Sequence, residues 1–70
     1  MKSFMAFVEW DPETNLYTGL VPGIPGAHSQ GATLDELHGN LQEVLELCLE
    51  ELQGIELPQF VGVQQINVSI

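Results

Sequence analysis

"GLVPGIPGAHSQGATLDEL", residues 19–37, is the stretch that decides the fold of this chain. It places two prolines and four glycines directly before a helix-start signal. Pro22 and Pro25 fix their own φ angles and hold the residues before them in extended geometry. Gly23 and Gly26 accept a positive φ. We therefore expect a rigid, non-helical corner that turns the chain from one strand into the next.

Glycine-rich loops before helices often bind phosphate, so the same stretch must be tested as a nucleotide site. A Walker-type loop needs a lysine, and residues 23–33 contain none. Pro25 removes a backbone donor, and the nearby Asp35 and Glu36 would repel a phosphate. We conclude that these glycines and prolines serve the shape of the chain.

An amphipathic helix is expected over about residues 34–53. Thr33 and Glu36 have the spacing of a capping box, which satisfies free backbone N–H groups at a helix start. Gly54 is a natural left-handed terminator, and Pro58 follows it. The predicted core-facing stripe contains seven residues at helical spacing: Leu34, Leu37, Leu41, Val44, Leu45, Cys48 and Leu52.

Strands are expected on both sides of this helix. Residues 3–10 and 16–22 should form an antiparallel hairpin around a turn at 11–15, followed by a short strand at 27–30 and a last strand at 60–70. The predicted class is α+β in the order β-β-β-α-β, with a mostly antiparallel four-stranded sheet and one helix on one face. A right-handed crossover would set the last strand parallel to the first. The other sheet face would remain uncovered, and we expect it to meet another subunit or a partner.

Length and charge limit the possible functions. Seventy residues, 1–70, suggest a single domain that is too small to bury a large core, so a homodimer or higher oligomer is expected. The net charge is −9, with ten acidic residues and Lys2 as the only Lys or Arg. Binding to nucleic acid or to an anionic membrane depends on Lys and Arg, so neither is expected. A basic protein is the favoured partner.

The sequence also predicts a cytoplasmic protein. Cys48 is the only cysteine, whereas a small secreted domain usually carries a disulfide framework. The first residues lack the long apolar run of a signal peptide, and no stretch approaches the length of a membrane span.

The stretch "LYTGLVPGIPGAHSQGATLDELHGNLQEVLELCLEE", residues 16–51, resembles the HicB-like antitoxin family. With the first strand, the similarity covers about residues 3–53. The positions that match the family pattern are Tyr17, Pro22, Pro25, Gly26, Gly31, Thr33, Glu36, Asn40, Glu43 and Leu47. The resemblance implies a truncated RNase H-like fold. It also implies a function as an antitoxin, which binds and blocks a small basic mRNA endonuclease of the HicA type.

Antitoxins of this family often carry a further DNA-binding domain that represses their own operon. We expect none in residues 1–70, and the chain lacks a basic arm. Autorepression by this chain alone is therefore not expected.

Charge and aromatic character indicate the candidate partner-binding residues. Trp10 suits an interface hot spot, although simple core packing explains it equally well. His28 is a candidate for the contact surface. The full set is Trp10, Asp11, Glu13, His28, Asp35, Glu43, Glu46 and Glu50.

Two other functions remain open from the sequence. A Mg²⁺-dependent nuclease would need Glu9 and Asp11 to converge with Glu43 or Glu46, but the helix acids are predicted to face away from the sheet. The other alternative is an orphan oligomeric protein-interaction or ligand-binding module that has no toxin. Neither histidine has the spacing of a zinc ligand pair. The sequence therefore predicts a binding protein without catalytic residues, metal or cofactor.

Overall fold

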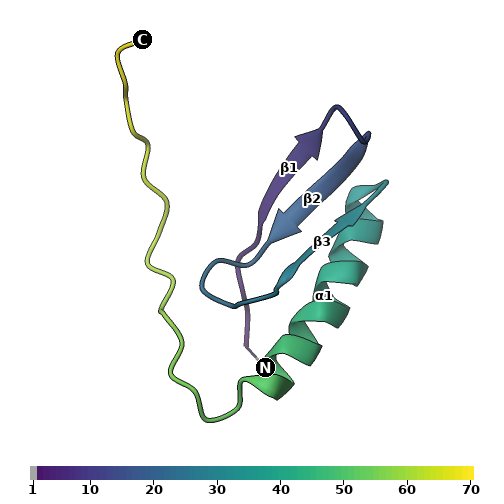
Figure 1. The fold of residues 1–70 in the computed structure, drawn as a ribbon, viewed down its shortest axis with the longest axis vertical. Coiled ribbons are helices and arrows are strands. Elements are labelled where there is room, and N and C mark those ends of the chain that lie inside the picture. The colour runs from purple at the N-terminus through teal and green to yellow at the C-terminus, as the bar shows by residue number, and fades with distance from the viewer. Residues whose placement is uncertain (1) are drawn as a thin grey trace.

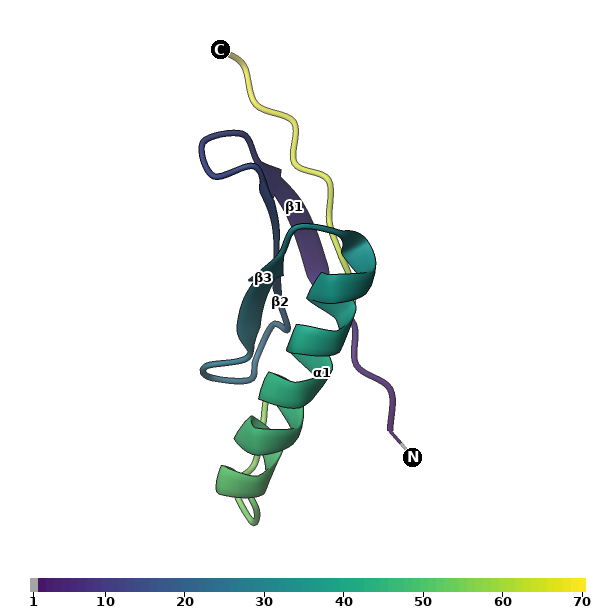
Figure 2. The same ribbon diagram turned by 90° about the vertical axis from the view of Figure 1, so that its right-hand side faces the viewer.

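A computed structural model describes residues 2–70 as an antiparallel sheet followed by one helix. The elements are β1 (Phe7–Asp11), β2 (Leu16–Leu20), β3 (His28–Gly31) and α1 (Leu34–Glu51). The strands lie in the order β1-β2-β3, and α1 covers one face of the sheet (Figures 1 and 2). The α+β class and the β-β-β-α part of the predicted order are therefore confirmed.

The β1–β2 hairpin forms as its turn residues predict. Asp11 Oδ1 accepts a hydrogen bond from the Glu13 N–H, and the Asn15 N–H donates to the Asp11 carbonyl, both over short distances (2.9 and 2.8 Å). Asn15 takes the left-handed conformation with φ 58°, which asparagine tolerates better than most residues. This turn sets the register in which Phe7 pairs with Leu20.

The proline–glycine corner supplies much of the core. Val21, Ile24 and Ala27 are buried and form one cluster. Backbone bonds close the corner: the Val21 N–H donates to the Ala27 carbonyl at 2.8 Å, and the Ala27 N–H donates to the Ile24 carbonyl at 3.1 Å. Gly26, with φ 81°, permits the sharp return. The corner thus shapes the chain as expected, and it also packs under α1, which the sequence pattern did not predict.

Gly31 allows α1 to start close to the sheet. A Cβ atom at this position would lie only 2.5 Å from the Leu37 backbone nitrogen, so any larger residue would push the helix away. Thr33 caps the helix as predicted, because its Oγ1 accepts a hydrogen bond from the Glu36 N–H at 3.0 Å. Gly54, with φ 79°, follows the last helical turn, which ends at Glu51 rather than at residue 53.

The apolar stripe of α1 faces the sheet with one exception. Leu37 and Leu41 are buried, and Leu45, Cys48 and Leu52 are partly buried against the corner cluster. Leu34 is 56% exposed, so its assignment to the core was wrong. Leu37 already packs against the last residue of β3, and a side chain one turn earlier lies past the end of that strand.

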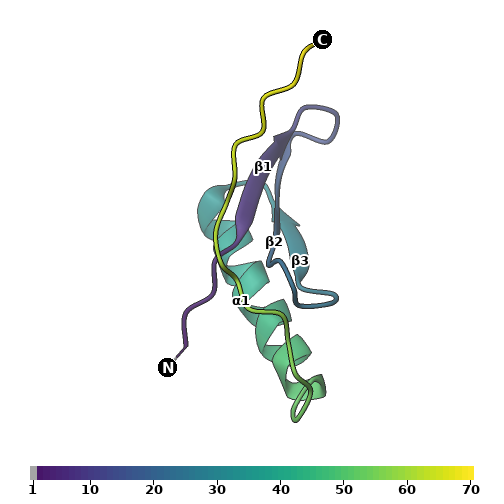
Figure 3. The same ribbon diagram turned by 90° about the vertical axis from the view of Figure 1, so that its left-hand side faces the viewer.

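The predicted fourth strand is not present in the described chain. Residues 60–70 form no strand, and residues 61–70, here called the C-terminal arm, extend away from the sheet on the side opposite α1 (Figures 1 and 3). The Phe60 ring packs edge-on against Phe7, with ring centroids 6.4 Å apart. Phe7 faces the open side of the sheet, so Phe60 covers part of this face next to β1. The arm nevertheless pairs with no strand of residues 2–70.

Candidate functional site

The outer face of α1 carries the largest group of predicted partner-binding residues. Asp35, Glu43, Glu46 and Glu50 lie on it, away from the sheet. Their spacing places them on one side of the helix, opposite the buried Leu37 and its neighbours. The helix thus presents these acidic side chains to solvent, as the sequence predicted.

The hairpin tip carries two more of these acids, Asp11 and Glu13. Glu13 is exposed, while Asp11 is half-buried and uses its Oδ1 to hold the turn. One carboxylate oxygen of Asp11 is therefore engaged in local structure.

His28 lies on the open face of the sheet, away from α1. It pairs across the sheet with Leu20, which in turn pairs with Phe7. Thr18 and Glu9 form the next row of the same face. Phe7 and Leu20 are each more than 40% exposed, so this surface combines apolar side chains with the polar ones. The predicted partner-binding residues therefore divide between opposite sides of the molecule and do not form one site.

Trp10 lies on the α1 side of β1 but is not covered by the helix. Its ring packs edge-on against Tyr17, with centroids 4.9 Å apart, and 48% of the residue remains exposed. Among the described elements, α1 contacts β2 and β3 but not β1. Val8, on the same side, is equally exposed. β1 thus lies outside the part of the sheet that α1 covers, and its apolar side chains on this face remain exposed.

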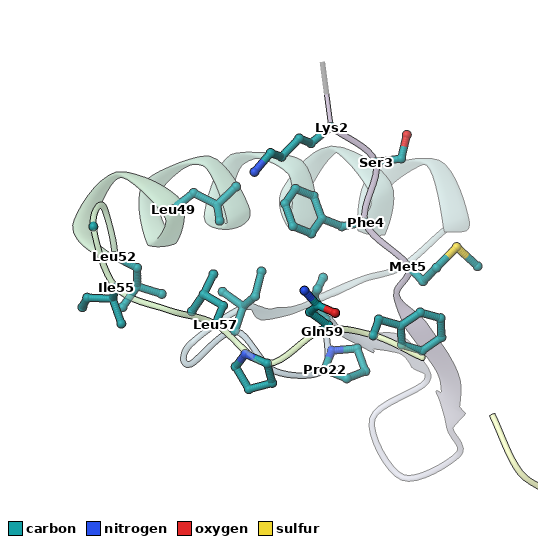
Figure 4. A pocket seen from close by; sticks show the side chains of 15 residues that line it. Lys2, Ser3, Phe4, Met5, Pro22, Leu49, Leu52, Ile55, Leu57 and Gln59 are labelled. Atoms are coloured by element: carbon teal, nitrogen blue, oxygen red, sulfur yellow. The ribbon is translucent and has the colours of Figure 1, made fainter. Parts of the chain in front are cut away.

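An apolar hollow lies between the N-terminal segment, the end of α1 and residues 55–60 (Figure 4). Phe4 and Met5 line one wall, and Leu49 and Leu52 line another. The sequence pattern did not reveal this hollow, because finding it requires knowing that the chain after α1 folds back along residues 2–5. The sequence feature that could have indicated this return is Pro58, which packs against Gly23 in the structure.

The carboxylates considered for a nuclease do not converge. Glu9 lies on the open sheet face and Asp11 at the hairpin tip, whereas Glu43 and Glu46 lie on the outer side of α1. Within residues 2–70, no group of three or more His, Cys, Asp or Glu side chains is placed to hold a metal ion. In the same residues, no helix has both the length and the apolar character required to cross a membrane.

Relatives of this chain occur in bacteria and in an archaeon. A UPF0150 protein of Thermotoga maritima is 48% identical over 69 residues, which are 97% of this chain and 92% of that protein. A UPF0150 protein of Synechocystis is 42% identical over 67 residues, covering 96% of each chain. A third, from Archaeoglobus fulgidus, is 40% identical over 66 residues, covering 94% of each chain.

These names state no activity, substrate or partner. No protein-family model matches the chain, and no solved structure matches it. The similarity covers the sheet, the helix and most of the segment after the helix.

Proposed function

This chain belongs to the UPF0150 family, and we propose that it acts as a HicB-like antitoxin that binds and occludes a small basic endonuclease. Two observations support the proposal. Residues 3–53 resemble the HicB-like antitoxins, and the outer surface of α1 is acidic. Its proposed setting is the cytoplasm, where a lone Cys48 would stay reduced.

The observation that carries the proposal is the acidic outer face of α1. Glu43, Glu46 and Glu50 lie within two turns of one rigid helix, on the side that faces solvent. An RNA-cleaving protein must bind phosphates with Lys and Arg, and such a basic surface is complementary to this face. A helix that covers those residues competes with RNA for the same positive charges. Occlusion therefore needs no catalytic group on the antitoxin.

The proposal includes the truncated RNase H-like relation that the resemblance implies. In that relation a fourth strand completes the sheet next to β1. The uncovered Val8 and Trp10 support this, because an added strand would give both side chains a neighbour.

Capture from the host lysate tests the proposal. The immobilised chain is expected to retain a small basic protein at about 0.05 M salt and to release it at about 0.5 M, because salt screens contacts between exposed charges. The captured protein should cleave RNA after release and should lose that activity when the chain is added back.

A matched pair of variants locates the contact. Glu43→Gln/Glu46→Gln/Glu50→Gln removes three charges from α1 and should weaken capture at least about tenfold. Glu9→Gln/Asp11→Asn/Glu13→Gln removes three charges from the hairpin and should weaken it far less. Equal losses would show a response to net charge alone, and capture that ignores salt would contradict the mechanism.

A second candidate function is an interaction or ligand-binding module without a toxin. The apolar hollow of Figure 4 favours it, since Leu49, Leu52 and Phe4 there face open space. Absence of any captured basic protein, together with binding of an apolar dye that Leu52→Glu abolishes, would support this alternative.

A further inference from the structure

We propose that the C-terminal arm of one copy adds as a fourth strand to the β1 edge of a second copy, with the exchange reciprocal in a two-fold dimer. The arm has the pattern of a strand but no partner strand within residues 2–70 of its own chain. Val61 is 95% exposed, and Ile66 and Val68 are each 71% exposed. This much apolar surface on an extended segment marks an interaction site.

The last five residues of the arm form a two-sided strand pattern. Ile66, Val68 and Ile70 fall on one side, and Asn67 and Ser69 on the other. One side is fully apolar and the other is neutral and polar. The pattern fits a strand whose one face is covered and whose other face meets solvent.

Of the two edges of the sheet, β1 is the free one. At the β3 edge, the Gln30 carbonyl accepts a hydrogen bond from Asn40 Nδ2 at 2.8 Å, and α1 packs over the strand. At β1, no strand of residues 2–70 pairs with the outer edge, and α1 does not reach it. The backbone N–H and C=O groups of β1 are thus available to an incoming strand.

The two faces of β1 match the two sides of the arm. On the α1 side, Val8 and Trp10 are half exposed and would lie beside Ile66 and Val68. On the open side, Glu9 would lie beside Asn67, whose amide N–H groups can donate to the carboxylate. A shift of one residue would place the apolar side chains beside Glu9, so the match fixes the register.

The attachment of the arm favours a second copy over its own sheet. Phe60 packs on Phe7, and Pro58 lies so close to Gly23 that a Cβ atom at position 23 would be 3.5 Å from the Pro58 Cβ. These contacts hold the start of the arm close to β1 of its own sheet, and the rest of the arm runs away from the sheet (Figure 3). Held in this way, the arm makes no backbone pairing with its own β1. Pairing with another copy leaves this contact intact.

The distribution of charge also favours a second copy of the chain as the partner of the arm. Two bodies of net charge −9 repel each other, but residues 57–70 contain no charged side chain. The arm therefore reaches the second copy without adding charged side chains to the contact. Because each copy supplies both an arm and an edge, a two-fold pair satisfies both copies.

Sedimentation of the full chain over a range of concentrations tests the exchange with two matched variants. Ile66→Lys/Val68→Lys should weaken dimerisation at least about tenfold, because two charged groups enter the apolar contact. Asn67→Lys/Ser69→Lys adds the same charge on the side of Glu9 and should leave dimerisation unchanged or tighter. If both variants respond alike, or if the unaltered chain is monomeric throughout, the proposal fails.

A mixed disulfide separates exchange from pairing within one chain. Val8→Cys and Ile66→Cys, each in a Cys48→Ala background, are mixed and oxidised. A disulfide-linked pair that contains one copy of each variant is expected, because adjacent strands bring these positions within bonding range. A dimer that does not form this link, or one held through the open sheet face, contradicts arm exchange.

The inference is independent of the antitoxin proposal, and salt distinguishes the two. Dimerisation of like-charged copies should tighten as salt rises, whereas capture of a basic protein should weaken. Either result can therefore fail without the other.

Discussion

β1 and the C-terminal arm are both extended and rich in apolar residues, yet only β1 lies in a sheet. The difference lies in what precedes and follows each segment. β1 is joined to β2 by a tight turn at Asp11–Asn15, which brings a partner strand into reach at once. The arm follows a helix and a return through Pro58, and it leaves the body without pairing with an edge strand. A strand pattern therefore needs a reachable edge before it becomes a strand.

The two regions also differ in how their apolar side chains are stabilised. In the body, Leu37, Val21 and Ile24 are buried between α1, the sheet and the corner. In the arm, every residue is exposed. Stability of a single copy should thus depend on the body alone.

Leu37→Ala should have the largest effect on the body. Leu37 is 2% exposed, and truncation leaves a cavity that costs about 2–5 kcal/mol of the free energy of unfolding. For a domain of this size, such a loss approaches the total stability. Urea denaturation followed by circular dichroism measures it. Leu47→Ala, on the exposed side of the same helix, should change the free energy by less than about 0.5 kcal/mol.

Gly31→Ala should have the next largest effect. The new Cβ would lie 2.5 Å from the Leu37 nitrogen and 2.9 Å from its Cα, and backbone atoms cannot move aside cheaply. We expect a loss of about 1–3 kcal/mol in the same denaturation experiment. Gly39→Ala is the control with the opposite sign: apart from the adjoining backbone of its own helix, no atom lies within 4 Å of its Cβ position, so it should stabilise α1 by about 0.5–1 kcal/mol. Equal effects at both glycines would contradict the close approach.

Much of the body could be predicted from the sequence because its signals are local. The Thr33 cap, the turn at Asn15 and the spacing of Leu37 and Leu41 each depend on neighbouring residues, and each formed as expected. The position of the acidic residues on the outer face of α1 was predicted from the same helical spacing. The arm was mispredicted because its strand pattern gives no information on which edge, or which copy, it meets.

The candidate site was harder to predict for the same reason. Sequence spacing placed Glu43 and Glu50 together on one helix face, but it could not show that His28 lies on the opposite side of the molecule. The return of residues 55–60 onto Phe4 depends on long-range packing, so the apolar hollow was missed.

Thr33→Ala should cost about 1 kcal/mol of stability, a smaller loss than either core change. The variant removes the oxygen that accepts from the Glu36 N–H and leaves that donor to water. Thermal unfolding measures the loss, and Thr33→Ser should restore most of it because serine caps equally well. A serine variant as unstable as the alanine variant would show that the methyl group, rather than the hydrogen bond, matters.

Val68→Ala should have the smallest effect, and it separates the arm from the body. At a concentration where the chain is monomeric, we expect a change of less than about 0.5 kcal/mol in the free energy of unfolding, because Val68 makes no core contact. Val21→Ala, the same substitution in the corner cluster, should be clearly destabilising at every concentration. At higher concentration the chain gains stability through association, and Val68→Ala should reduce that gain while Val21→Ala should not. A large loss from Val68→Ala in the monomer would mean that the arm packs on its own body, and the contrast with β1 would then no longer hold.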